Sequence, residues 1–154
     1  MMLSSSDFTK LKECNPCFLG VYPQNKLPIT HHCVRPWCLI INSDTHTLPG
    51  KHWIAVYAPP HVNSVLFVDP LNLPVNRYSY IKNWLGQCFS HIIVLPYSIQ
   101  PTYSIWCGAY CMYILKQLPL HNYDLYHVVK KYFLSNDLNL NDVMISNWYN
   151  KFIQ

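Results

Sequence analysis

A cysteine stands at the head of an apolar segment whose residue spacing predicts a helix. Cys107 directly precedes the small residue Gly108 and the apolar run that follows. A thiol at a helix N-terminus feels the positive end of the helix dipole and unpaired backbone N–H groups, which favour the thiolate. Gln100, upstream in the same stretch, could donate an amide hydrogen to a developing oxyanion. The pattern indicates a cysteine nucleophile with an oxyanion hole, although a cysteine here is also a common small core residue.

A histidine and an aspartate at strand ends could complete such a site. His52 opens one predicted strand and Asp69 closes the next one. If those strands are antiparallel neighbours, the start of the first lies beside the end of the second. Asp69 would then accept a hydrogen bond from one imidazole nitrogen, while the other nitrogen would face Cys107 and take its proton. Nucleophile, base, orienting carboxylate and oxyanion donor would then all be present.

Each of these residues also has an ordinary structural explanation. A lone histidine at a strand end is usually half-exposed, Asp-Pro is a common strand-terminating turn, and a glutamine before proline is an ordinary loop residue. Taken singly, each ordinary explanation would prevail. The combination, in workable topological positions, shifts the balance toward catalysis.

The elements that must position these residues follow from the apolar spacing. A short helix is expected over residues 4–13, followed by 18–22 leading into a Pro-containing loop. Apolar runs predict buried strands at 37–42, 52–57, 65–68 and 92–95. The first three are joined by short turns, which predicts an antiparallel meander. Helical spacing recurs at 77–89, 107–118, 125–134 and 141–152. The fold class is therefore α+β, a mainly antiparallel sheet packed with helices, one of them buried.

The composition bounds the class of protein. With 154 residues, half of them apolar and only 12% charged, the chain is expected to form a single domain over 1–154 with a real core. No apolar run approaches the length of a membrane span, and the N-terminus lacks the form of a signal peptide. We expect a reducing intracellular compartment, with the seven cysteines as thiols. The net charge of +4 would tolerate a polyanion such as DNA without indicating one.

The chain resembles the adenovirus protease (adenain) family, within the wider group that includes SUMO-deconjugating cysteine proteases. The matching residues, in the order His, Asp, Gln, Cys, are His52-Trp53, Asp69-Pro70, Gln100, Cys107-Gly108 and Cys111. The stretch from Cys14 to Tyr22 also resembles the family's N-terminal Cys-Gly-Pro-Tyr-Phe-Leu-Gly-Thr-Tyr, and 38–42 resembles its first strand. The likeness covers residues 3–118, and the region after Pro119 has no match.

The resemblance implies a papain-like cysteine protease fold with the nucleophile at the N-terminus of a buried helix. It implies that His52 is the general base, that Asp69 is its partner, where adenovirus enzymes usually have Glu, and that Cys107 is the nucleophile. The Gln100 side chain would form the oxyanion hole with the Cys107 backbone N–H. Cys111, one helical turn further on, would be a packing residue.

A narrow substrate cleft is a further implication of the resemblance. Trp53 would lie against the His52 ring and keep water from it, and Trp53, Trp106 and Gly108 would contact the substrate. The family prefers small residues, often glycine, next to the scissile bond. We therefore expect maturation cleavage of viral capsid or core precursors at Gly-containing sites, in the virion and the host cell nucleus, by a monomer that needs no metal.

Activation is left open by the resemblance. Some adenovirus enzymes are activated by a short viral peptide, disulfide-linked to a cysteine, and by DNA. Cys88 lies near the corresponding place, but its register differs, and the chain is shorter than those enzymes. The resemblance therefore leaves an activating peptide and weakly bound DNA as candidate partners. We expect that no cofactor is required and that the protein does not associate with a membrane.

Two other functions remain compatible with the sequence. Removal of ubiquitin or SUMO from host proteins shares the same chemistry and the Gly-Gly preference. A zinc-binding interaction module is the alternative from another class, because thiols and imidazoles with metal-ligand spacing occur at Cys14, Cys17, His31, His32, Cys33 and Cys38. The apolar setting of Cys38 and the family likeness around Cys14 weaken the zinc hypothesis.

Overall fold

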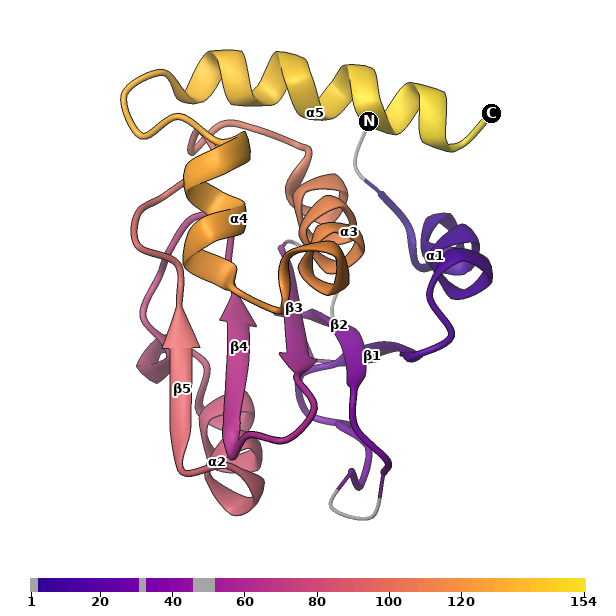
Figure 1. Cartoon of the computed structure of the whole chain (residues 1–154), viewed down its shortest axis with the longest axis vertical. Helices are drawn as coiled ribbons and strands as arrows, with labels where there is room; N and C mark the ends of the chain where they lie inside the picture. Colours follow the sequence, from indigo (N-terminus) through magenta and orange to yellow (C-terminus); the bar gives the residue numbers. More distant parts are fainter. Residues whose placement is uncertain (1–2, 31–32, 46–51) are drawn as a thin grey trace.

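The structure, a computed structural model, describes residues 3–30, 33–45 and 52–154. Its centre is a five-stranded sheet in the order β1-β2-β3-β4-β5, with helices packed on both faces (Figure 1). The strands are β1 (Phe18–Pro23), β2 (Trp37–Asn42), β3 (Trp53–Ala58), β4 (Ser64–Val68) and β5 (His91–Val94). Strands β2, β3 and β4 form the antiparallel meander that the sequence predicts.

The side chains of the central strands are buried on both faces of the sheet. Along β3, Ala55 and Tyr57 point into the core beneath α3 (Cys107–Gln117), whereas Ile54 and Val56 point into the core beneath α2 (Ser79–Cys88). Strands β2 and β4 alternate in the same way. Burial on both faces explains why these strands are continuous apolar runs rather than alternating polar and apolar sequences.

Helices α1, α4 and α5 pack on the α3 side of the sheet. Besides α2 and α3, the described α-helices are α1 (Thr9–Cys14), α4 (Leu125–Tyr132) and α5 (Leu138–Phe152). Short 3₁₀ helices occur at Ser5–Phe8, Val75–Arg77 and Leu118–His121. Helix α5 lies across the end of the molecule at which α3 begins (Figure 1). Nine consecutive residues of α3, from Cys107 to Leu115, are buried, so α3 is the buried helix that the apolar run predicts. No helix in the described part of the chain is long and apolar enough to cross a membrane.

The sheet differs from the expected one at its two edges. Residues 18–22, expected to lead into a loop, form strand β1, which pairs in parallel with β2; β5 likewise runs parallel to β4. An irregularity between Phe18 and Val21, with Gly20 at φ +137°, interrupts the periodicity of β1. A positive φ is unstrained only for glycine, so this strand has no clean two-residue pattern to detect. The antiparallel expectation therefore holds for the centre of the sheet and not for its edges.

Candidate active site

Cys107 is the first residue of α3, as its position in the sequence predicts. Its residue is 4% exposed, and the preceding residue, Trp106, provides no side-chain cap for the helix. Uncapped first-turn N–H groups and the positive end of the helix dipole favour negative charge at this position. The local environment of Cys107 therefore suits a thiolate and, next to it, an oxyanion.

His52 and Asp69 meet at one edge of the sheet because of the strand register. Ala55 pairs with Val68 across the antiparallel β3–β4 pair, which places the residues before β3 beside those after β4. His52 Nε2 lies 2.7 Å from Asp69 Oδ1. An ionised carboxylate can only accept a hydrogen bond, so Nε2 carries the hydrogen and Nδ1 is the nitrogen left for another partner. The structure therefore brings this sequence-predicted pair into contact.

The protonation of His52 connects it to Cys107. Burial alone would lower the pKa of the imidazole, but hydrogen bonds to Asp69 and to Cys107, with the negative charges of both, raise it to about 9. An interaction with Cys107 thus contributes to the raised pKa of His52, and Nδ1 is the imidazole nitrogen that the contact with Asp69 leaves for it. The three residues together can hold an imidazolium between a carboxylate and a thiolate.

Asp69 is held by more than the histidine. It is 1% exposed, and its two oxygens accept hydrogen bonds from His52, from the backbone N–H of Leu71 at 3.0 Å and from the hydroxyl of Tyr78 at 2.8 Å. Burial, and then the negative charge of Asp69, raise the pKa of Tyr78, so its hydroxyl remains a donor. A buried carboxylate with three donors has a fixed orientation, which in turn fixes the imidazole.

Tyr78 is a site residue that the sequence did not reveal. It stands just before α2, and its ring belongs to the core on the α2 side of the sheet. No motif distinguishes it from the other eleven tyrosines. Only the arrangement of α2 relative to the end of β4 brings its hydroxyl to Asp69.

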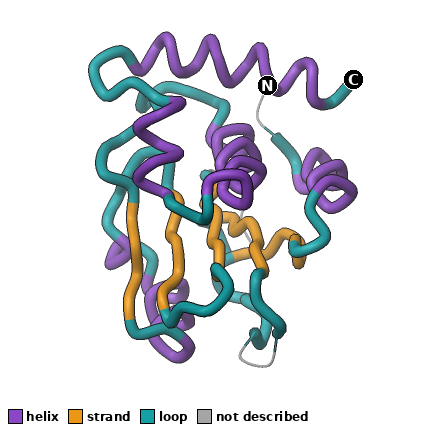
Figure 2. The backbone as a smooth tube through the Cα atoms, viewed as in Figure 1, coloured by secondary structure: helices purple, strands orange, loops and turns teal. Residues whose placement is uncertain are grey.

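Gln100 lies in the loop that joins β5 to α3 (Figure 2). It is 2% exposed; its backbone N–H donates to Pro70 O at 3.2 Å, and its Nε2 donates to Ser104 O at 3.1 Å. Its Oε1 is buried and has no partner in the described part of the chain. The side-chain amide is therefore oriented by one hydrogen bond, to Ser104 of the same loop. The second N–H hydrogen of the amide remains for an oxyanion.

Trp53 and Gly108, which we expect to contact the substrate, are packed against other parts of the chain. Trp53 is 4% exposed, its Nε1 donates to Leu3 O at 3.2 Å, and its ring meets that of Phe8 edge-on with centroids 4.9 Å apart. Gly108 is buried beneath the same segment. The N-terminal residues cover both positions, which leaves Trp53 and Gly108 little surface for a substrate. Trp106 is half-buried and packs against Tyr149, with ring centroids 5.7 Å apart.

Cys111 is a core residue, as expected. It is fully buried, and its Sγ lies 3.4 Å from Trp53 O. Burial raises the pKa of this thiol well above its usual value. A thiol kept neutral and enclosed is a poor nucleophile.

The candidate zinc ligands that the structure describes, Cys14, Cys17, Cys33 and Cys38, do not form a metal-binding group. Cys38 belongs to the core on the α3 side of the sheet, whereas Cys33 packs on the α2 side. His31 and His32 lie outside the described residues. Across residues 3–30, 33–45 and 52–154, no group of three histidine, cysteine or acidic side chains could hold a metal ion, and all seven cysteines are free thiols.

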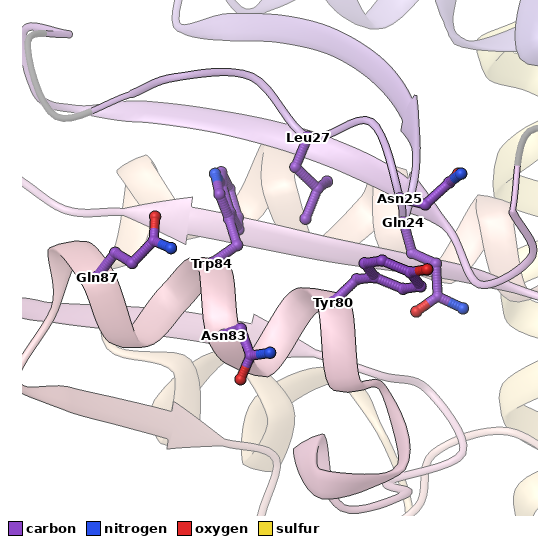
Figure 3. Close-up of a pocket in the computed structure, with 7 residues that line it drawn as sticks. All are labelled: Gln24, Asn25, Leu27, Tyr80, Asn83, Trp84 and Gln87. Carbon is purple, nitrogen blue, oxygen red and sulfur yellow. The ribbon is translucent and has the colours of Figure 1, made fainter.

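A separate hollow lies on the α2 side of the sheet. It has a volume of about 240 Å³ between α2 and the segment after β1, where Leu27, Tyr80 and Trp84 face one another (Figure 3). Trp84 Nε1 is already bonded to Pro28 O at 2.8 Å. This hollow is on the opposite face of the sheet from α3 and contains none of the sequence-predicted site residues.

Comparison with known proteins places the fold. No protein-family model and no curated protein sequence matches the chain. The chain is similar to the crystal structure of the ASFV pS273R protease, with 14% identity and a TM-score of 0.54 over 94% of this chain and 66% of that one. It is also similar to a structure described as AvrA delL154 with IP6, CoA, with 14% identity and a TM-score of 0.56 over 96% and 67%. This chain spans about two thirds of each of those proteins. At this identity the likeness establishes the α+β fold that the chain shares with the pS273R protease.

Proposed function

We propose that the chain is a cysteine endopeptidase of the adenain type. The observation that carries the proposal is the hydrogen bond between His52 and Asp69, together with the interaction of His52 with Cys107 at the first turn of a buried helix. The fold shared with the pS273R protease supports the same conclusion. Cys107 is the nucleophile, His52 the general base and acid, Asp69 the orienting carboxylate and Gln100 an oxyanion donor.

The acylation step follows from this assignment. The Cys107 thiolate attacks the carbonyl carbon of the scissile peptide bond and forms a C–S bond, while the carbonyl π electrons move to the oxygen. The resulting oxyanion is stabilised by the Cys107 backbone N–H and by the free amide hydrogen of Gln100. As the intermediate collapses, the C–N bond breaks, and His52 gives its Nδ1 proton to the leaving amine.

Deacylation reverses the roles of His52. Neutral Nδ1 takes a proton from water, and the water oxygen attacks the thioester carbon through a second tetrahedral intermediate. The C–S bond breaks and restores the imidazolium–thiolate pair, and the new carboxylic acid leaves and loses its proton to the solvent. Asp69 keeps Nε2 protonated throughout, so Nδ1 is always the nitrogen that exchanges protons.

For the substrate we propose viral capsid or core precursors cleaved at Gly-containing sites, with Trp106 as one wall of the cleft. We place this activity in the virion and the host cell nucleus, in a monomer that uses no metal. An activating peptide or DNA is tested by adding each to the purified chain. Full activity of the chain alone would remove the need for either.

Removal of ubiquitin or SUMO is the alternative, because it uses the same residues and the same Gly-Gly preference. The rates of cleavage of the two kinds of substrate distinguish this alternative from the proposed function. If a SUMO or ubiquitin reporter is cleaved as fast as the best Gly-containing peptide, the alternative takes precedence. A further assay with acetyl-CoA tests for acyl transfer in place of cleavage, because one structural neighbour is described with CoA.

The decisive experiment is cleavage of a library of Gly-containing peptides by wild type, Cys107→Ala and Cys111→Ala. The two substitutions are chemically identical and lie one helical turn apart in α3. We expect Cys107→Ala to abolish cleavage and labelling by an electrophilic Gly-Gly probe, and Cys111→Ala to retain both. Cleavage that survives Cys107→Ala would contradict the proposed mechanism.

A further inference from the structure

The loop between β5 and α3 is organised around one serine. The Ser104 carbonyl accepts the hydrogen bond from Gln100 Nε2 at 3.1 Å, and the Ser104 hydroxyl accepts one from the backbone N–H of Trp106 at 3.1 Å. Its backbone N–H donates to Pro101 O at 3.0 Å. Ser104 therefore determines both the direction of the Gln100 amide and the path of the chain into Cys107.

An aspartate of the C-terminal helix holds this serine. The Ser104 hydroxyl donates to Asp142 Oδ1 at 2.7 Å, and the hydroxyl of Tyr110 donates to the same oxygen at 2.8 Å. Tyr110 is fully buried and lies one turn after Cys107 in α3. Burial and the hydrogen bond to Asp142 raise the pKa of Tyr110, so that it stays a donor. One carboxylate oxygen thus connects the loop to the first turns of α3.

The neighbouring residue holds the other end of the loop. Asn141 is 2% exposed, and its Nδ2 donates to Ile99 O at 3.0 Å and to Leu134 O at 2.8 Å. Its Oδ1 accepts from the backbone N–H of Leu134 at 2.8 Å. Every polar atom of this side chain is used, and one of its contacts is the residue directly before Gln100.

We propose that Asn141 and Asp142 are positioning residues, which present the Gln100 amide to the oxyanion by fixing the loop at Ile99 and Ser104. This role rests on the proposed protease function. Because Gln100 Oε1 has no partner in the described part of the chain, the Ser104 carbonyl is the contact that orients the amide. Loss of the Asp142 carboxylate frees Ser104, and the amide then loses its fixed direction while Cys107 and His52 keep their own contacts.

Three variants test the role of Asp142. Asp142→Ala removes the acceptor for Ser104 and Tyr110, whereas Asp142→Asn keeps an oxygen in the same place. Asp137→Ala is the matched control, because Asp137 caps the same helix through Leu140 N at 3.1 Å, and no hydrogen bond in the described part of the chain joins its side chain to Ile99 or Ser104. Ser104→Ala is a second route to the same defect if Asp142→Ala folds poorly.

We expect the defect to appear in kcat. Since a single oxyanion donor is worth about 10²–10³ in kcat and here is misdirected rather than removed, Asp142→Ala should lower kcat about 10- to 100-fold with KM changed less than about threefold. Asp142→Asn should recover most of that loss, and Asp137→Ala should leave kcat unchanged. Alkylation of Cys107 by iodoacetamide, which forms no oxyanion, should proceed at the wild-type rate in all three variants.

The outcomes are distinguishable from failure of the protease proposal. A wild-type chain that cleaves no peptide overturns the protease function and, with it, this role. An active wild type with unchanged kcat in both Asp142→Ala and Ser104→Ala overturns the positioning role alone. Equal losses of kcat and of Cys107 alkylation, matched by Asp137→Ala, would show a general loss of structure and would also overturn it.

Discussion

Burial and hydrogen bonding act in opposite directions on His52, and the hydrogen bonds prevail. An imidazole in an apolar setting is usually neutral, yet the pKa of His52 rises to about 9 because Asp69 and Cys107 each hold its charged form. At neutral pH the residue is therefore an imidazolium. A cysteine beside this positive charge is ready to attack before a substrate binds.

Replacing Asp69 by asparagine should move the alkaline limit of activity. Without the carboxylate, the pKa of His52 loses its largest favourable contribution, so the alkaline limb of kcat/KM should fall from about pH 9 by about 1–2 units. The measurement is the pH profile of peptide cleavage. Asp124→Asn is the control, since Asp124 caps α4 through His127 N and asparagine is an equally good cap. An unshifted limb in Asp69→Asn would show that Asp69 does not set the charge of His52.

The residue contacts that could be predicted were those that depend on strand order alone. His52 and Asp69 meet because each adjoins the end of a strand in an antiparallel pair, which the apolar runs already indicate. Tyr78 and Asp142 could not be predicted, because they reach the site from helices whose placement depends on packing. A hydroxyl or carboxylate on a helix surface has no local signature of its distant partner.

At the scale of the elements, the N-terminal segment packs against the start of α3 beside the candidate site. A Cβ added at Gly108 would lie 2.7 Å from Leu3 Cδ1, 3.0 Å from Phe8 Cζ and 3.1 Å from Trp53 Cδ1. The two rings can move little, whereas the end of the leucine side chain can rotate away. Gly108 therefore permits this segment to pack directly on the first turn of α3.

Gly108→Ala should lower the free energy of unfolding by about 1 kcal/mol, since overpacking costs about 1–3 kcal/mol and the helical preference of alanine returns about 1 kcal/mol. Leu3→Ala lowers the free energy of unfolding on its own. The double variant should nevertheless lose less than the sum of the two single losses, because the shorter side chain makes room for the added Cβ. Urea denaturation of the two single variants and the double variant measures the coupling. Gly86→Ala in α2 is the control, with nothing within 4 Å of its added Cβ, and it should be stabilising. Strictly additive effects would mean that Leu3 does not limit the space at Gly108.

The missed strand β1 shows what element prediction lacks. Its residues are only partly buried after Phe18, and Gly20 breaks its alternation, so its strand character comes from pairing with β2. Strands β1 and β5 are each parallel to their neighbour because the connecting chain returns to the end of the sheet at which the neighbouring strand begins. Apolar periodicity predicts which residues are buried, but the partner and direction of an edge strand are tertiary choices.

At the scale of the whole molecule, the candidate site is also a source of stability that depends on pH. The pKa of His52 is raised from 6.5 to about 9, so folding favours its protonated form. This contribution is fully present below about pH 6.5 and is lost as pH rises through about 9. With about 1.4 kcal/mol for each unit of pKa shift, the free energy of unfolding should fall by up to about 3 kcal/mol over that interval. Urea denaturation of wild type and His52→Gln at pH 6.5 and 9.5 isolates the histidine, because cysteines and tyrosines elsewhere titrate in both proteins. A pH dependence that is the same in both would mean that the imidazolium is not held by Asp69 and Cys107.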